Sequence, residues 1–154
     1  MSADATPELG TAPRNWVIGA ISGLIAGIAF GAIMSHTEMM GMVAMLFDLE
    51  EVWLGWVIHF VFSIVFGIGF AAIVAIDAVS AWSDRPSRGA VSGLVYGIIV
   101  WVIGAAIIMP LWMGTVQPVD PPVPDWNMMS LAGHIAFGVV LGVLYPVLLD
   151  HEPN

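Results

Sequence analysis

Residues 19–28 read GAISGLIAGI and residues 89–98 read GAVSGLVYGI, so one apolar stretch occurs twice in the chain. The two copies differ only by Ile for Val at two positions and by Ala26 for Tyr96. A second pair of stretches aligns on its histidines: His59, Phe62, Val65, Gly67 and Phe70 match His134, Phe137, Val140, Gly142 and Tyr145. Self-similarity at a fixed offset indicates a duplicated structural unit. The sequence therefore predicts a hairpin of two helices that has been duplicated.

The composition places this duplicated hairpin in a membrane. Of the 154 residues, 59% are hydrophobic and only 10% are charged, which is far more apolar than a soluble domain. About 20 apolar residues in a helix cross the roughly 30 Å hydrocarbon core of a bilayer. Four stretches have this character, at about residues 16–34, 52–76, 89–109 and 128–149. The predicted fold class is an all-α membrane protein, a bundle of four transmembrane helices made from a tandem 2+2 repeat.

Each predicted hairpin enters and leaves the membrane on the same side, so the two copies are expected to be parallel. They would then be related by a pseudo-twofold axis along the membrane normal. The first apolar stretch is interpreted as a retained helix, because it is too long for the hydrophobic region of a signal peptide and no small-x-small cleavage site follows it. The predicted domain spans residues 15–149.

The segments outside the four spans have different characters. Residues 1–14 are acidic and contain proline, which predicts a disordered tail, and residues 150–154 form a C-terminal tail. The third span is expected to end at Pro110. Residues 114–127 hold four prolines, cannot continue the helix and are expected to form an extended loop. In the segment 35–51, apolar residues recur at helical spacing, which predicts a short amphipathic helix at the interface: Met39, Met42, Val43, Leu46 and Phe47.

The basic residues predict the orientation. Arg14 precedes the first span, Arg85 and Arg88 lie between the second and third, and there is no lysine. Because cytoplasmic loops are enriched in Lys and Arg, both termini and the 77–88 loop are expected in the cytoplasm, with the loops 35–51 and 110–127 external at the cell membrane. Twelve Asp and Glu give a formal net charge of −9. This charge argues against a nucleic-acid partner and favours a halophilic archaeal source.

Small residues recur at every fourth position of the spans, as they do where membrane helices approach closely. The predicted helix-packing residues are Gly19, Gly23, Gly27 and Gly31 in the first span, Ser63 and Gly67 in the second, Gly89, Gly93 and Gly97 in the third, and Gly138 and Gly142 in the fourth. Tight packing is the favoured interpretation, and a pore or ligand cleft lined by small residues is the alternative.

Two histidines are the leading candidates for chemistry. His59 and His134 are expected at matched depth on helix interfaces, where they could ligate a b-type haem, or join His36, Met39 and Met40 in a copper site. The favoured interpretation is that they hydrogen-bond across helix interfaces and bind no cofactor. The chain has no cysteine, which excludes disulfides and thiolate ligands.

No Walker loop, kinase motif, GxSxG or HExxH is present, so enzyme activity is not expected. The leading functional hypothesis is a structural or accessory subunit that packs through its glycine faces against a membrane protein partner or a second copy of itself in the lipid bilayer. The alternatives are a haem- or copper-binding redox protein, and a small oligomeric channel or carrier.

Five stretches give the chain a family resemblance: GLIAGIAFGAIMS in the first span, the segment MVAML, GWVIHFVFSIVFG in the second span, MPLWMG ending the third, and GHIAFGVVLGVLYP in the fourth. Together they resemble an uncharacterised family of small four-helix membrane proteins of bacteria and haloarchaea, catalogued as a domain of unknown function. The resemblance covers residues 19–148. It implies a four-helix membrane fold and no particular activity.

Overall fold

The computed structural model describes residues 11–151, and in this range every regular element is a helix. The elements are α1 (Thr11–His36), α2 (Met40–Met45), α3 (Val52–Val74), α4 (Asp77–Ser80), α5 (Pro86–Val100), the π-helix η1 (Trp101–Ile108), α6 (Met109–Val116) and α7 (Met128–His151). Four helical segments are long and apolar enough to cross a membrane: Arg14–His36, Val52–Val74, Pro86–Val116 and Met128–Asp150. The predicted all-α, four-span fold class is confirmed, while the tandem repeat and its parallel arrangement stay predictions.

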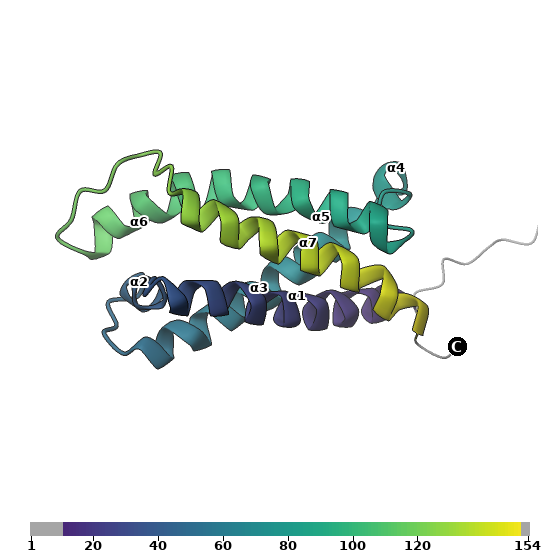
Figure 1. Ribbon diagram of the computed structural model, residues 1–154, viewed down its shortest axis with the longest axis horizontal. Coiled ribbons are helices and arrows are strands. Elements are labelled where there is room, and N and C mark those ends of the chain that lie inside the picture. Colours follow the sequence, from purple (N-terminus) through teal and green to yellow (C-terminus); the bar gives the residue numbers. More distant parts are fainter. Residues whose placement is uncertain (1–10, 152–154) are drawn as a thin grey trace, which may run out of the picture.

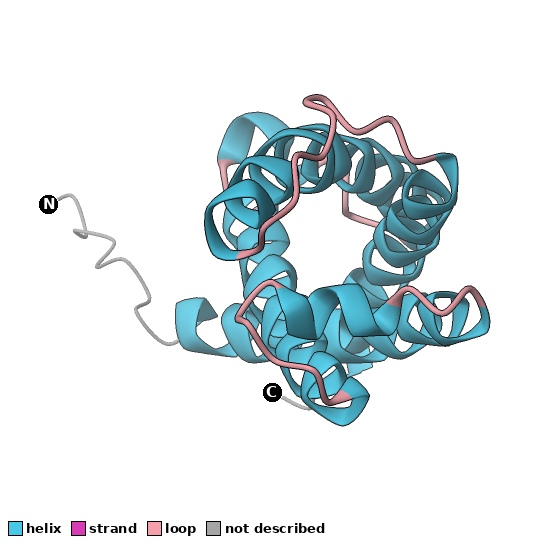
Figure 2. Ribbon diagram, turned by 90° about the vertical axis from the view of Figure 1, so that its left-hand side faces the viewer, coloured by secondary structure: helices cyan, strands magenta, loops and turns pink. Residues whose placement is uncertain are grey.

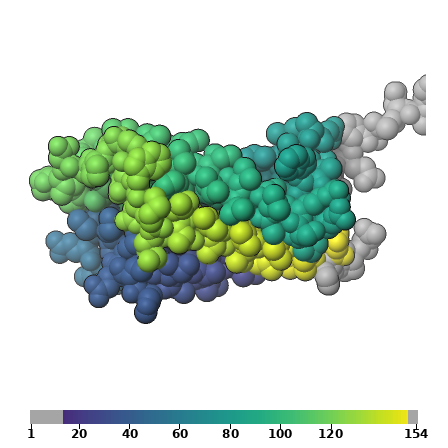
Figure 3. Space-filling model, turned by 45° about the horizontal axis from the view of Figure 1, so that its top comes forward, coloured from purple at the N-terminus to yellow at the C-terminus, as the bar shows by residue number. Residues whose placement is uncertain are grey.

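The four long helices form a ring when viewed along the bundle axis (Figure 2). α1 packs on α3, α5 packs on α7, and α7 also packs on α1. Figure 3 shows α7, in green to yellow, running between α1 and α5 on one face of the molecule. α2 and α6 lie at one end of the bundle, here called the α2/α6 end, and α4 lies at the other (Figure 1). The bundle therefore consists of two hairpins joined through α1 and α7.

The fourth side of the ring, between α3 and α5, is more open. Tyr96 on α5 reaches across it, donating a hydrogen bond from its hydroxyl to the Phe66 carbonyl at 2.8 Å. The Tyr96 ring also lies against Phe70, with ring centroids 5.4 Å apart. The Tyr96 side chain thus connects α3 and α5. On the other three sides of the ring, the neighbouring helices pack directly against each other.

Large apolar side chains cover the outside of the spans. Val61, Val91 and Ile103 are each more than half exposed, although each lies within a long apolar helix. A soluble monomer rarely exposes a continuous apolar surface of this kind, whereas lipid tails cover it well. The exposed surface is therefore of the kind expected of a multi-pass membrane protein.

The expectation that the third span ends at Pro110 is wrong, because the helix continues through η1 and α6 to Val116. Proline lacks an N–H, so Pro110 cannot bond the carbonyl of Ala106, four residues earlier. The N–H of Asp125, in the proline-rich loop, bonds that carbonyl instead at 2.8 Å. The loop replaces the missing donor, so the helix can continue and the loop itself starts at residue 117.

Other boundaries also differ from expectation. α1 begins at Thr11, so residues 11–14 of the expected tail are helical, and α7 continues to His151. Residues 1–10 and 152–154 of the predicted tails lie outside the described residues. A short helix, α2, is present in the segment 35–51, with Met40 and Val43 buried and Met42 exposed. Its position at a membrane interface stays a prediction.

Candidate functional site

Glycines bring α1 and α3 into backbone contact. A Cβ atom at Gly19 or Gly23 would overlap backbone atoms of Gly67, and one at Gly27 would overlap the side chain of Ser63. Gly31, the last of the series, faces the ring of Trp56. Since any side chain at these positions would separate the helices, the glycines allow the close approach on which membrane helices depend.

The contact between α5 and α7 is as close. A Cβ atom at Gly89 would overlap the carbonyl of Gly142, and one at Gly93 would overlap that of Gly138. Gly97 lies against the carbonyl of His134. Pro146 lies inside α7 and has no N–H with which to bond the Gly142 carbonyl, which faces Gly89. The glycine faces of all four spans are thus covered by other helices of the same chain.

His59 fastens one of these interfaces. Its side chain is 6% exposed, and its Nε2–H donates to the Gly27 carbonyl on α1 at 2.8 Å. The Ser63 hydroxyl donates to the His59 carbonyl at 2.7 Å. His59 thus bonds across to a neighbouring helix, in the manner that its interface position suggested.

His134 is held differently. Asn127 accepts a hydrogen bond from the Ser130 N–H at 3.0 Å, which caps the start of α7. One turn later, the Nδ1–H of His134 donates to the Ser130 carbonyl at 2.8 Å. This bond stays within α7, so it orients the imidazole without joining two helices.

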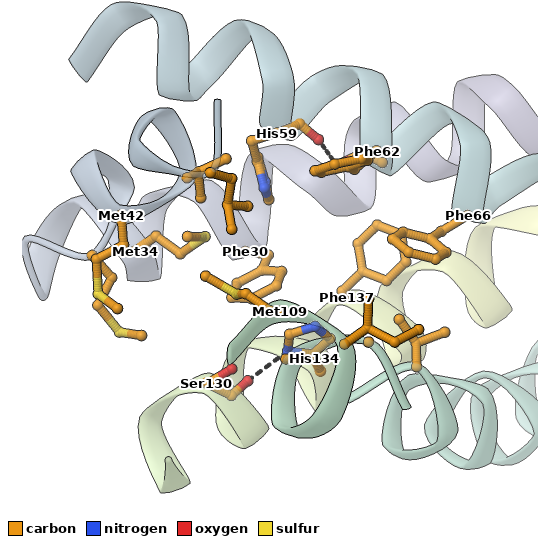
Figure 4. Close-up of a pocket in the computed structure, with 18 of the residues that line it drawn as sticks. Phe30, Met34, Met42, His59, Phe62, Phe66, Met109, Ser130, His134 and Phe137 are labelled. Atoms are coloured by element: carbon orange, nitrogen blue, oxygen red, sulfur yellow. Dashed lines mark hydrogen bonds between the residues drawn. The ribbon is translucent and has the colours of Figure 1, made fainter. Parts of the chain in front are cut away.

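The Phe30 ring lies between the two imidazoles (Figure 4). It makes edge contacts with both, at centroid separations of 5.4 Å to His59 and 4.7 Å to His134. Phe30 comes from α1, His59 from α3 and His134 from α7. The bundle therefore brings the two predicted histidines to one place, with a phenyl ring separating them.

These three residues form the base of a cavity of about 510 Å³. Phe30 and Phe137 at its base are 8% and 3% exposed, whereas Phe62 on α3 and Ile103 on η1 at its rim are 37% and 52% exposed. The walls are α3 on one side and η1 with α6 on the other, and the lining is almost wholly apolar. Because the rim residues belong to the outer surface of the spans, the cavity opens sideways between α3 and η1.

Polar contacts lie at the two ends of this cavity. At the α2/α6 end, the Trp112 Nε1–H donates to the Leu46 carbonyl at 2.6 Å, and the Gln117 amide donates to Met45 and Asp48 at 3.1 Å. Toward the other end lies the Tyr96 bridge. Between these contacts, the exposed rim residues Phe62 and Ile103 leave a lateral route into the cavity, on the side that would face lipid in a membrane.

The other predicted ligands have separate environments. His36 is exposed at the end of α1, Met39 lines the cavity, and Met40 is 1% exposed in the core. Among the described residues, no group of three or more His, Asp or Glu side chains is placed to hold a metal ion, and the copper site that includes methionines stays a prediction. A haem held between His59 and His134 would require the Phe30 ring to leave its place.

Several residues of the cavity were not predicted from the sequence, and the aligned halves of the chain contain the signal that could have found them. Phe30 aligns with Val100, and Gly133 aligns with Ile58. In the structure the Phe30 ring packs directly on Gly133. These aligned positions, at which the side chains differ greatly in size, are thus positions at which α1 of one hairpin packs on α7 of the other.

Comparisons with models of protein families, with curated proteins and with solved structures found no match to this chain. The family resemblance of the sequence therefore stays a prediction. Function has to be inferred from the cavity and the residues that line it.

Proposed function

We propose that this chain is a non-enzymatic integral membrane protein that takes a lipophilic molecule from the bilayer and holds it in the cavity between α3 and η1. The observation that carries the proposal is a largely apolar cavity of about 510 Å³ with its opening on the exposed apolar surface. Its volume is within the range of small-molecule sites, and a few polar groups at the base of an apolar pocket are what such sites use to orient a ligand.

The π-helix η1 supports a binding role. π-helical turns are rare and are found frequently at functional sites. Half of the residues that the third span contributes to the cavity wall belong to η1: Ile103, Gly104, Ala105 and Ile108. The irregular part of the bundle thus forms part of the cavity wall.

The accessory-subunit hypothesis loses its main support, since it relied on glycine faces that a partner could cover. Those faces are already covered by the chain's own helices. A partner or second copy would have to bind the larger, lipid-facing side chains instead. The redox hypothesis would need a rearrangement of Phe30, and no specific observation favours the channel or carrier.

Blocking the cavity tests the binding proposal. Gly104 lines the cavity, and a Cβ atom there would have no neighbour closer than 4.0 Å, so Gly104→Leu adds bulk to the cavity without a backbone clash. Gly41→Leu is the matched control, because nothing lies within 4 Å of a Cβ there and the residue does not line the cavity. We expect mass spectrometry of protein purified in mild detergent to detect a stoichiometric lipophilic molecule in wild type and Gly41→Leu.

In Gly104→Leu we expect at least a tenfold loss of that molecule, with a melting temperature that is unchanged or raised. Equal amounts of the molecule in all three proteins, or none in the wild type, would contradict the proposal. Replacing glycine in a helix usually stabilises it by about 1 kcal/mol, so misfolding of Gly104→Leu is not the expected explanation of a loss.

Cysteine labelling tests the proposed orientation. The chain has no cysteine of its own, so a single introduced thiol reports one position. Asp120 and Ser87 are both exposed. Asp120 is in the loop that follows α6, and Ser87 is in the first turn of α5, close in sequence to α4, so they belong to opposite ends of the bundle (Figure 1). If the α2/α6 end is external, a membrane-impermeant maleimide applied to intact cells will label Asp120→Cys and will label Ser87→Cys only after the cells are opened. The reverse pattern would invert the topology.

A further inference from the structure

The hydrogen bonds at the base of the cavity determine which atoms a ligand would meet. A neutral imidazole has one N–H donor and one bare nitrogen that accepts. The carbonyl of Gly27 accepts the N–H of His59, and the carbonyl of Ser130 accepts that of His134. The remaining ring nitrogens, Nδ1 of His59 and Nε2 of His134, are therefore acceptors. Neither has a hydrogen-bond partner within the described part of the chain.

Donors in the cavity are mostly occupied. The Ser63 hydroxyl bonds the His59 carbonyl, and the Trp112 N–H bonds the Leu46 carbonyl. The Ser130 hydroxyl can donate or accept, so it does not discriminate between ligands. The base of the cavity thus has an excess of acceptors, and a ligand that brings its own O–H would satisfy them. Leaving a buried polar group unpaired costs about 1–3 kcal/mol, so this match matters for affinity.

The apolar lining indicates the body of the ligand. Phenylalanines contribute from two helices, Phe62 and Phe66 on α3 and Phe137 on α7, and Met34 and Met109 lie nearby (Figure 4). Aromatic rings pack favourably edge-to-face or offset against other rings, and thioether sulfurs make favourable contacts with rings. A ring is therefore favoured over a simple acyl chain at the base, with an apolar tail passing out through the lateral opening.

We propose that the occupant is a lipid-soluble aromatic alcohol of the quinol class, whose ring hydroxyl donates a hydrogen bond to His134 Nε2. This inference rests on the proposed function. His134 is the better placed of the two acceptors, because it is only partly buried and its ring is directed into the cavity, whereas His59 is 6% exposed (Figure 4). The proposal concerns binding alone and includes no electron transfer.

A quinol and its own quinone provide a matched pair of probes, since they have nearly the same shape and only the quinol has O–H donors. We would measure binding of a decyl-tailed benzoquinone, oxidised or reduced with dithionite, to the full chain in detergent by quenching of tryptophan fluorescence. Wild type is expected to bind the quinol at least tenfold more tightly. His134→Phe retains a ring against Phe30 and removes the acceptor, so we expect it to lose this preference.

Two further variants complete the test. His134→Gln restores a side-chain acceptor and is expected to recover part of the preference, whereas His36→Phe changes an exposed histidine outside the cavity and should leave it unchanged. Equal affinity for both probes in the wild type, or a preference that survives in folded His134→Phe, would overturn this inference. If neither probe binds, the quinol assignment is also wrong. The cavity proposal is judged separately, by the mass spectrometry of wild type and Gly104→Leu.

Discussion

Gly93→Ala is expected to destabilise the bundle by about 3 kcal/mol, although it adds a single methyl group. The carbonyl of Gly138 already occupies the place where that methyl group would lie. Backbone on both sides prevents either group from rotating away, so α5 and α7 would have to separate along their length. Reversible unfolding in detergent, followed by circular dichroism during titration with a denaturing detergent, would measure the loss.

Gly104→Ala is the control for this prediction, because it makes the same chemical change in the same continuous helix. A Cβ atom at Gly104 has open space around it, so we expect its free energy of unfolding to be unchanged or slightly raised. Similar stabilities for Gly93→Ala and Gly104→Ala would show that the close contact between α5 and α7 does not determine stability.

The contrast between these two glycines shows what could be read from the sequence. Four apolar stretches predicted the four spans, because length and composition alone determine whether a helix can cross a bilayer. The spacing of Gly89, Gly93 and Gly97 predicted a flat helix face. Gly104 lies outside that spacing, and nothing in the sequence shows that it lines a cavity.

Pro110 is a clear case of a local rule overridden by a distant contact. The sequence rule that proline ends a helix assumes that no other donor reaches the orphaned carbonyl. Asp125 supplies that donor from the loop, and the span gains α6. α6 in turn carries Trp112, whose Nε1–H donates to the carbonyl of Leu46, the residue that follows α2, at one end of the cavity. No pattern local to residues 101–110 encodes this contact.

The cavity itself arises from a difference between the two halves of the chain. Ala26, at 0% exposure, lies in the helix that packs against both α3 and α7, whereas its aligned residue Tyr96 spans the gap between α3 and α5. A small residue permits close approach, and a large one holds the helices apart. The sequence displays this substitution, but only the packing shows that it leaves an opening on one side of the ring.

The second large effect is expected at Gly133, where the two hairpins meet. The Phe30 ring lies where a Cβ atom of residue 133 would be. Gly133→Ile would push this ring away from His59 and His134, with a loss of two edge contacts worth about 0.5–1.5 kcal/mol each. Added strain between α1 and α7 brings the expected destabilisation to about 3 kcal/mol. The same detergent unfolding titration would measure it.

The aligned residues of the other half provide a compensating change. In the alignment of the two halves, Val100 on α5 matches Phe30, and Ile58 on α3 matches Gly133. The double variant Phe30→Val with Gly133→Ile therefore places the Val and Ile side chains of the α3–α5 side at the contact between α1 and α7. Valine frees the space that isoleucine needs. In a double-mutant cycle we therefore expect a favourable coupling of about 2 kcal/mol, within the range for residues in direct contact. Strictly additive effects would mean that the Phe30 ring does not set the distance between the hairpins. The opening between α3 and η1 would then need a cause other than the unequal packing of the two halves.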